Sequence, residues 1–136
     1  MFVKDYSFIK IRQGDTSRPY LPITIVNPEN KKELNVYALV DTGADECALP
    51  ASFASLLGHN LQAGFEKQIG TGNGMTTAYG HTICIKVFDF KTKDVIVDFL
   101  PNLNVPLLGV KSFLGNFVLK IDYPKKTVSI DFPPKR

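Results

Sequence analysis

Ala38-Leu39-Val40-Asp41-Thr42-Gly43-Ala44-Asp45 is an apolar run that leads directly into a carboxylate. Three consecutive apolar positions predict a strand buried on both faces. An Asp directly after such a strand is expected to be paired or functional, because burying a bare carboxylate costs free energy. The tripeptide Asp41-Thr42-Gly43 by itself favours a simple turn, since all three residue types are common in turns. Its meaning therefore depends on the rest of the chain.

Short extended runs separated by turn residues dominate that chain. Strands are expected over residues 6–11, 21–26, 34–40, 95–100 and 105–108, with hairpins over 67–87 and 117–132. The first hairpin turns at Gly70-Thr71-Gly72-Asn73-Gly74, where Asn-Gly is a strong two-residue turn signal. Short helices are expected over 50–57, where Phe53, Leu56 and Leu57 share a face and Gly58 ends the helix, and over 111–114. These elements predict a closed or sandwiched all-β fold.

Length and composition limit the classes of protein to which the chain can belong. A chain of 136 residues, 44% hydrophobic and 21% charged, predicts one globular domain over residues 1–136. No apolar run reaches the roughly 18 residues of a membrane span, and the N-terminus has the pattern of neither a signal nor a transit peptide. Cys47 and Cys84 are too few for a disulfide framework and lack metal-ligand spacing with His59 or His81. We therefore expect a cytoplasmic protein without a metal site.

Three separated elements together resemble the retropepsin-like aspartic peptidases. The first is the strand into Asp41-Thr42-Gly43-Ala44, the second is the glycine-rich hairpin after Ile69, and the third is Leu107-Leu108-Gly109 ahead of a short helix. The resemblance covers roughly residues 20 to 132. The stretch Cys47-Ala48-Leu49-Pro50 and the last hairpin are more similar to the non-viral bacterial and cellular members.

The resemblance implies an all-β, closed acid-protease-type β-barrel with its active site at a homodimer interface. Two Asp41 carboxylates, one from each subunit, would activate water to hydrolyse a peptide or protein substrate, without metal or cofactor. Thr42 would brace the two loops across the twofold axis, and Gly43 and Ala44 would line the cleft floor. Residues 69–75 would form a flap. The expected substrate-binding residues are Ala44, Asp45, Ile69, Gly70, Thr71 and Gly72.

Some neighbouring residues keep two interpretations. Ile69 and Met75 are candidates for pocket walls or for the core. His81 is interpreted as a surface or strand residue, not as a catalytic base. Cys84, between two isoleucines, is expected to be a buried apolar filler.

One position differs from the pattern of the retroviral members. Retroviral members carry an Arg after the glycine that corresponds to Gly109, and it braces the active-site loop through the Asp that corresponds to Asp45. Here the position is Val110. Asp45 is therefore expected to pair with Arg12 or Arg18, or to turn outward toward substrate.

Two other classes of function compete with the peptidase. One is a catalytically weak or inactive binding or dimerisation module with the same fold, which Val110 favours. The other is a small basic nucleic-acid-binding barrel, which the sequence pI of about 8.8 favours. Lys and Arg are scattered among Asp and Glu and form no basic stripe, so nucleic acid is not an expected partner.

Overall fold

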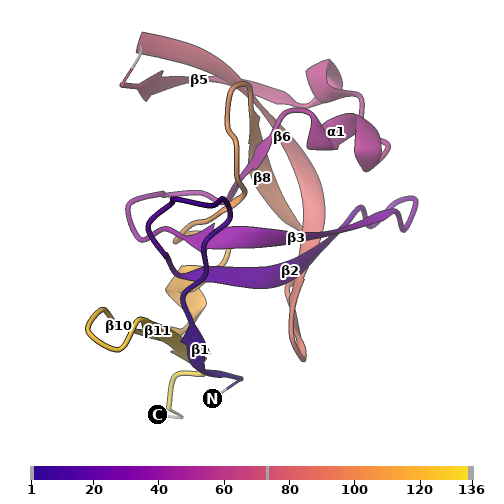
Figure 1. Cartoon of the computed structure of the whole chain (residues 1–136). Helices are drawn as coiled ribbons and strands as arrows, with labels where there is room; N and C mark the ends of the chain where they lie inside the picture. Colours follow the sequence, from indigo (N-terminus) through magenta and orange to yellow (C-terminus); the bar gives the residue numbers. More distant parts are fainter. Residues whose placement is uncertain (1, 73, 135–136) are drawn as a thin grey trace.

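The computed structural model describes residues 2–72 and 74–134. Strands dominate this part of the chain, and the helical segments are short (Figure 1). The strands are β1 (Val3–Ser7), β2 (Tyr20–Val26), β3 (Glu33–Val40), β4 (Ala48–Pro50), β5 (Phe65–Thr71), β6 (Gly74–Val87), β7 (Phe90–Lys91), β8 (Val95–Leu100), β9 (Leu107–Leu108), β10 (Val118–Asp122) and β11 (Thr127–Asp131). The helical segments are α1 (Phe53–Leu56), η1 (Leu61–Ala63) and η2 (Leu114–Asn116). Among the described residues, none of these helices is long and apolar enough to cross a membrane.

The strands form two sheets. A small antiparallel sheet has the order β1-β11-β10 and lies at the end of the molecule that carries both termini (Figure 1). The large sheet has the order β2-β3-β9-β4-β8-β6-β5, and β2 also pairs with β6. The sheet therefore curls back onto its first strand. The expected all-β acid-protease-type fold is confirmed, but the sheet is not a strictly closed barrel, because β4 and β9 are joined by the single pair Ala48 and Leu107.

Alternating side chains build the core. Leu21, Ile23 and Ile25 of β2 point inward and are buried. Ala38 and Val40 of β3 are also buried, whereas Leu39 between them is only half-buried. The expectation that this run is buried on both faces is therefore wrong at Leu39, which lines a hollow beside Phe8 and Arg18.

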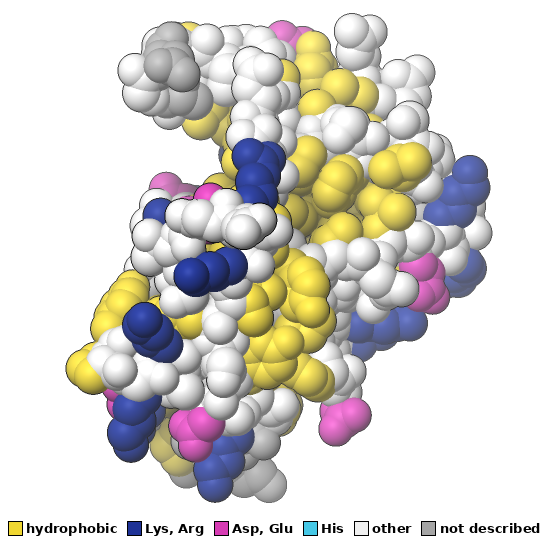
Figure 2. Space-filling model, viewed as in Figure 1, with side chains coloured by type: hydrophobic (Ala, Val, Ile, Leu, Met, Phe, Trp, Pro, Cys, Tyr) yellow, Lys and Arg dark blue, Asp and Glu magenta, His cyan; other side chains and the backbone are white. Residues whose placement is uncertain are grey.

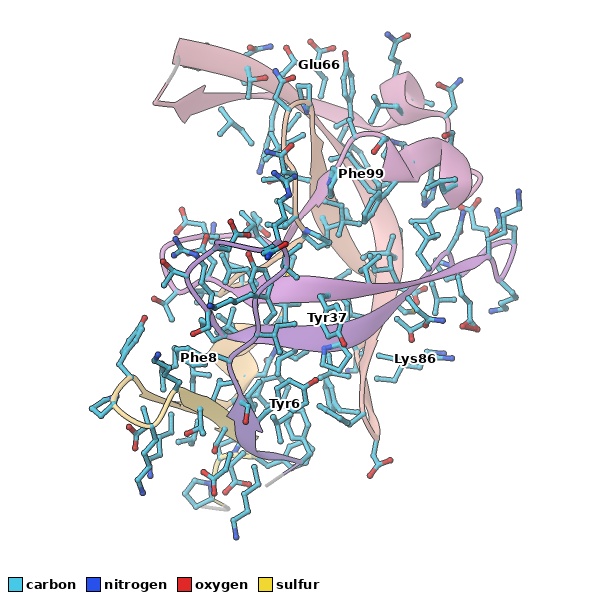
Figure 3. All side chains as sticks on the ribbon, viewed as in Figure 1. Tyr6, Phe8, Tyr37, Glu66, Lys86 and Phe99 are labelled. Carbon is cyan, nitrogen blue, oxygen red and sulfur yellow. The ribbon has the colours of Figure 1, made fainter. Side chains whose placement is uncertain are left out.

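Phenylalanine rings join the two sheets. Phe2 from the N-terminal end, Phe90 of β7 and Phe117 before β10 contact one another with ring centroids 5.0 to 5.5 Å apart. Stacked and edge-to-face contacts between aromatic rings add to the free energy gained by burial. Figure 3 shows Tyr6 and Phe8 toward this end of the molecule and Glu66 on the β5–β6 hairpin at the opposite end.

Both predicted helices differ from the structure at their first residues. Residue 50 belongs to β4, because Pro50 lies beside Leu100 in a parallel pair and Ala51 N–H continues the ladder to the Leu100 carbonyl. The helix α1 therefore starts only at Phe53, and Leu56 is 57% exposed instead of sharing the buried face of Leu57. Gly58 does end the helix, with a φ of 76°. The second helix is displaced to η2, because residues 110–113 form turns.

The remaining elements follow the prediction with shifted limits. The strand expected over 6–11 is β1, which ends at Ser7, and Ile9 forms only an isolated bridge with Arg18. The strand expected over 105–108 is reduced to β9. The hairpin β5–β6 pairs Thr71 with Gly74, so Gly74, the second residue of the predicted Asn-Gly turn, belongs to β6. Asn73, the predicted turn residue, lies outside the described residues.

Two histidines in contact with each other hold η1 against β6. The rings of His59 and His81 are 4.6 Å apart between centroids. The His59 Nε2 atom lies 3.2 Å from the Thr82 carbonyl oxygen, and the His81 Nε2 atom lies 2.8 Å from that of Leu61. His81 is therefore a buried strand residue with a structural contact. Burial, and then the neighbouring His81 ring, lower the pKa of His59 from its ordinary 6.5.

A pH-dependent stability follows from this pair. The unfolded chain binds a proton at His59 more readily than the folded chain, so the free energy of unfolding is highest above pH 6.5 and falls as the pH drops below it. We expect a His59→Gln variant to lose less stability than the parent between about pH 7 and pH 5, because its side chain does not titrate there. Urea unfolding across this range measures both slopes. Equal slopes for parent and variant would contradict the assignment.

Candidate active site

Asp41 lies where β3 ends beside β9. The two strands run parallel, with Leu39 beside Leu107 and Val40 beside Leu108. Asp41 N–H donates to the Leu108 carbonyl at 3.1 Å, and the Asp41 carbonyl accepts from Ala44 N–H at 3.2 Å. These bonds turn the chain sharply after the strand. The Asp41 carboxylate is consequently held at the rim of the sheet and not inside the core.

The Asp41 side chain is half-buried and faces an open surface. Its Oδ1 atom accepts a hydrogen bond from Gly43 N–H at 3.0 Å. Thr42 and Gly43 beside it are exposed. Within residues 2–72 and 74–134, Asp41 forms no ion pair with a Lys, Arg or His side chain. The carboxylate is thus oriented by its own loop but left accessible.

Backbone hydrogen bonds brace the loop where an Arg is missing. Val110 N–H donates to the Ala44 carbonyl at 2.9 Å, and Lys111 N–H donates to the Asp45 carbonyl at 2.8 Å. The two segments can approach this closely because Gly109 lies between them. A Cβ atom at Gly109 would collide with the Glu46 carbonyl group and lie 2.9 Å from the Ala44 carbonyl oxygen. The Val110 side chain takes no part in this bracing and is 38% exposed.

Charged side chains add a second brace that the sequence analysis missed. Lys111 Nζ lies 3.5 Å from Glu46 Oε1, and the Ser112 hydroxyl donates to Glu46 Oε2 at 3.3 Å. The cation that follows Gly109 is thus Lys111, one position after Val110, and it pairs with the residue after Asp45. Asp45 itself is exposed and, among the described residues, pairs with neither Arg12 nor Arg18. Of the three possibilities for Asp45, the structure agrees with the outward orientation.

A cleft separates this loop from the β5–β6 hairpin. It has a volume of about 490 Å³ and is the hollow below the overhanging hairpin in Figure 2. Five of the residues predicted for the site line it, namely Gly43, Ala44, Asp45, Ile69 and Gly70. Asp41 and Thr42 lie outside its lining, next to Gly43, and Gly72 is exposed outside it as well. The side chain of Thr71 is not among those described. Met75 is 68% exposed, so its core alternative is wrong.

Three further charged residues line the cleft, and the sequence analysis did not select them. They are Glu46, Lys67 and Asp98. Asp98 lies in the apolar run Val95-Ile96-Val97-Asp98-Phe99-Leu100, where a lone carboxylate among buried apolar residues was the available signal. Its side chain is 10% exposed and pairs with Lys67 Nζ at 3.0 Å.

The two cysteines have different surroundings. Cys47 lies under the loop, where its Sγ accepts a hydrogen bond from Gly109 N–H at 3.3 Å, and burial raises its pKa to about 11. Cys84 is buried as expected, and its thiol also donates to Asp94 Oδ1 at 2.9 Å. Burial, and then this hydrogen bond, raise the pKa of Cys84. Both thiols are free and protonated at neutral pH, so neither is a nucleophile candidate.

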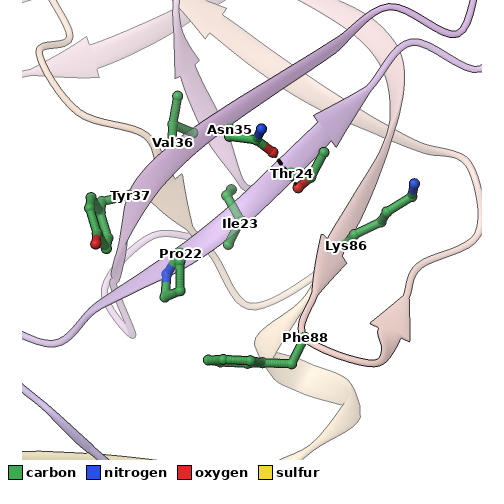
Figure 4. Close-up of a pocket in the computed structure, with 8 residues that line it drawn as sticks. All are labelled: Pro22, Ile23, Thr24, Asn35, Val36, Tyr37, Lys86 and Phe88. Carbon is green, nitrogen blue, oxygen red and sulfur yellow. Dashed lines mark hydrogen bonds between the residues drawn. The ribbon is translucent and has the colours of Figure 1, made fainter.

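A hollow of about 500 Å³ lies elsewhere, on the outer face of the β2–β3 hairpin (Figure 4). Tyr37, Lys86 and Phe88 line it, together with Thr24 and Asn35, whose side chains are joined by a hydrogen bond of 2.7 Å. None of the Asp41 loop contributes to it. The cleft beside Asp41 is therefore the candidate active site, although this other hollow is slightly larger.

Comparison with known proteins assigns the family. The model of the family described as gag-polyprotein putative aspartyl protease matches residues 28–116, more than half of the chain. The chain therefore belongs to this family of retropepsin-like aspartyl proteases. No curated protein matches it in sequence.

Solved structures agree with the fold. A retropepsin-like aspartic protease from Rickettsia conorii is 25% identical, with a TM-score of 0.66, and the match covers 93% of this chain and 99% of that chain. The retroviral protease-like domain of Ddi1 from Leishmania major is 16% identical, with a TM-score of 0.59, and the match covers 88% and 97% of the two chains. The similarity to a non-viral bacterial protease agrees with the features noted around Leu49-Pro50.

Proposed function

We propose that this chain is an aspartic endopeptidase that works as a homodimer. Water would be activated between two Asp41 carboxylates, one from each subunit, and residues 69–75 would act as the flap. The position of Asp41 carries the proposal: it is an accessible carboxylate, oriented by Gly43 N–H, in a loop whose next residues, Gly43 and Ala44, line a cleft. Family membership and the similarity to the protease from Rickettsia conorii support the same activity.

The chemistry requires a second carboxylate. The sequence contains a single Asp-Thr-Gly, so a symmetric dimer is the arrangement that supplies two. Two carboxylates a few Å apart share one proton, because both cannot ionise at that distance. The ionised member takes a proton from water, and the protonated member polarises the scissile carbonyl. The titration then belongs to the pair and not to either residue.

The β5–β6 hairpin suits the function of a lid. It extends beyond the rest of the sheet (Figure 1), and its first strand contributes residues 67–70 to the lining of the cleft. An extended peptide between Ile69 of the hairpin and Ala44 of the floor would be held by backbone hydrogen bonds in the manner of an added strand. Closure of the hairpin would exclude water from the reacting groups.

The shared site predicts a steep dependence on concentration. Below the dissociation constant of the dimer, the rate of peptide cleavage should rise with the square of the chain concentration, so a tenfold dilution lowers it about a hundredfold. Cleavage of a peptide library at acidic and neutral pH, with and without a pepstatin-type inhibitor, supplies the assay. Sedimentation over the same range measures the dimer. A rate proportional to concentration in a strictly monomeric sample would contradict the shared site.

The alternative is a binding or dimerisation module that keeps this fold without turnover. Val110 favours it, because the Arg of the retroviral members is missing. The backbone and Lys111 contacts that brace the loop weigh against it. Dimer formation without cleavage of any library peptide would select the module.

We further propose a cytoplasmic location, because the two cysteines are free and a reducing compartment keeps thiols in this state.

A further inference from the structure

A second hollow continues the cleft away from Asp41. It has a volume of about 290 Å³, and its lining includes Phe65, Glu66 and Ile96 together with Glu46, Lys67 and Asp98. We call it the distal pocket. The last three residues also line the cleft, so the two hollows lie next to each other. A peptide that occupies the cleft in an extended conformation can therefore reach the distal pocket with a residue further along its chain.

The register of three strands creates the pocket. Phe65 of β5 pairs with Gly80 of β6, which in turn pairs with Asp98 of β8. These residues share one face of the sheet, and the middle one has no side chain. A Cβ atom at Gly80 would lie 3.0 Å from Ile96 Cγ2 and 3.5 Å from Phe65 Cβ. The pocket thus exists because a glycine separates two flanking side chains.

The floor of the pocket is charged. Lys67 Nζ of β5 lies 3.0 Å from Asp98 Oδ2. The Asp98 side chain is 10% exposed and the Lys67 side chain is 47% exposed. Asp98 is also fixed through its backbone, since its N–H donates to the Cys47 carbonyl at 3.1 Å. Of the other two carboxylates in the lining, Glu46 is already paired with Lys111 at 3.5 Å, and Glu66 follows Phe65 in β5 and so projects to the opposite face of the strand. Asp98, which shares its charge with the partly exposed Lys67, is therefore the carboxylate of the pocket that a cationic ligand can reach.

The walls are apolar and uncovered. Phe65 is 69% exposed and Ile96 is 49% exposed. A ligand that fits both features has an aliphatic stem and a cationic head. Arginine and lysine side chains have this form, because they pack their methylene groups on apolar surface while the charge reaches a polar partner. A cation close to the Phe65 ring gains further attraction from the ring face.

We propose that the distal pocket selects substrates with an Arg or Lys side chain at one position away from the scissile bond. The stem lies between Phe65 and Ile96, and the head is attracted to Asp98. Lys67 competes with the substrate for Asp98 and so limits the preference. This inference rests on the proposed peptidase function, because it assigns a substrate residue to a pocket beside the same cleft.

Matched peptides test the proposal. In a peptide that the parent cleaves, each position on both sides of the cut is occupied in turn by Arg, Lys or the uncharged norleucine. At one position we expect kcat/KM for Arg or Lys to exceed that for norleucine about fivefold at pH near 6, where carboxylates are ionised. Added salt should reduce the ratio, because it screens charges at a partly open site.

Two variants with opposite effects separate the proposal from a loss of structure. Asp98→Asn should bring the ratio of Arg to norleucine close to one, while Lys67→Gln should raise it by removing the competing cation. Glu33→Gln removes a carboxylate from β3, outside the pocket, and serves as the matched control, with the ratio of the parent. A ratio near one at every position of the parent, or an Asp98→Asn ratio equal to that of the parent, would overturn the inference.

A binding measurement distinguishes failure of the inference from failure of the peptidase function. If the parent cleaves no peptide, the proposed function fails. The pocket is then tested by binding alone: fluorescence anisotropy measures the affinity of labelled Arg and norleucine peptides for the Asp41→Asn variant. Tighter binding of the Arg peptide, lost in the double variant with Asp98→Asn, would support it. Equal binding of both peptides would overturn it.

Discussion

The substitution Asp41→Asn should lower the rate of peptide cleavage at least about 10³-fold while the fold and the dimer persist. An amide cannot accept the proton of the attacking water, and general base catalysis by a positioned carboxylate contributes about 10²- to 10⁴-fold. The fold should persist because an Asn side-chain oxygen can still accept the hydrogen bond from Gly43 N–H. Cleavage rates, urea unfolding and sedimentation measure the three properties.

Asp89→Asn provides the matched control. Asp89 is an exposed residue in the turn between β6 and β7, and its substitution changes the charge by the same amount. It should leave cleavage within about twofold of the parent. A variant Asp41→Asn that cuts as fast as the parent would remove Asp41 from the mechanism.

Mixing the two chains extends the test to the shared site. In dimers that exchange subunits, an excess of Asp41→Asn chains captures parent chains in dimers with one carboxylate. Parent activity should therefore fall as the inactive chain is added. Activity that stays constant through the titration, with exchange shown by labelled subunits, would contradict a site built from two chains.

The second large effect is expected at Gly109. The substitution Gly109→Ala places a methyl group against the backbone of Glu46 and Ala44, and backbone atoms cannot move aside as a flexible side chain can. The loop must then shift and lose its hydrogen bonds from Val110 and Lys111. We expect the free energy of unfolding to fall by about 3 kcal/mol, at the upper end of the usual cost of overpacking. Cleavage should fall with it, since the Asp41 loop loses its brace.

Gly72→Ala is the matched stability control. A Cβ atom at Gly72 meets nothing within 4 Å, and the residue does not have a positive φ. Its free energy of unfolding should stay within about 1 kcal/mol of the parent. Urea unfolding of both variants measures the difference. If Gly109→Ala were as stable as Gly72→Ala, the close packing of the two segments would not hold the loop.

Residues 38–50 show which parts of the structure a local sequence pattern can predict. The apolar run before Asp41 predicted a strand, and β3 ends at Val40. The helix expected from residue 50 was misplaced, because Pro50 is held extended by the pairing of β4 with β8, whose residues lie about fifty positions away. Propensity acts within a few residues, whereas such a pairing depends on the register of distant strands. A single sequence carries little information about that register.

The contact between Lys111 and Glu46, which supports the Asp41 loop, could not be predicted for the same reason. The absence of an Arg at Val110 is visible in the sequence, but its replacement is not. The pairing of Lys111 with Glu46 joins two residues 65 positions apart, and only the folded chain shows that their side chains meet. Likewise, nothing in the order of residues indicates that Lys67 reaches Asp98 across β6.

The sequence by itself therefore determined the strand that ends at Val40 before Asp41, the glycine-rich β5–β6 hairpin and the family, because these depend on side-chain alternation and on short motifs. The tertiary structure alone decided what holds the Asp41 loop, which way Asp45 points and which charges line the cleft. These properties depend on how strands pair across the sheet, where a glycine such as Gly109 or Gly80 sets the distance between segments remote in the chain.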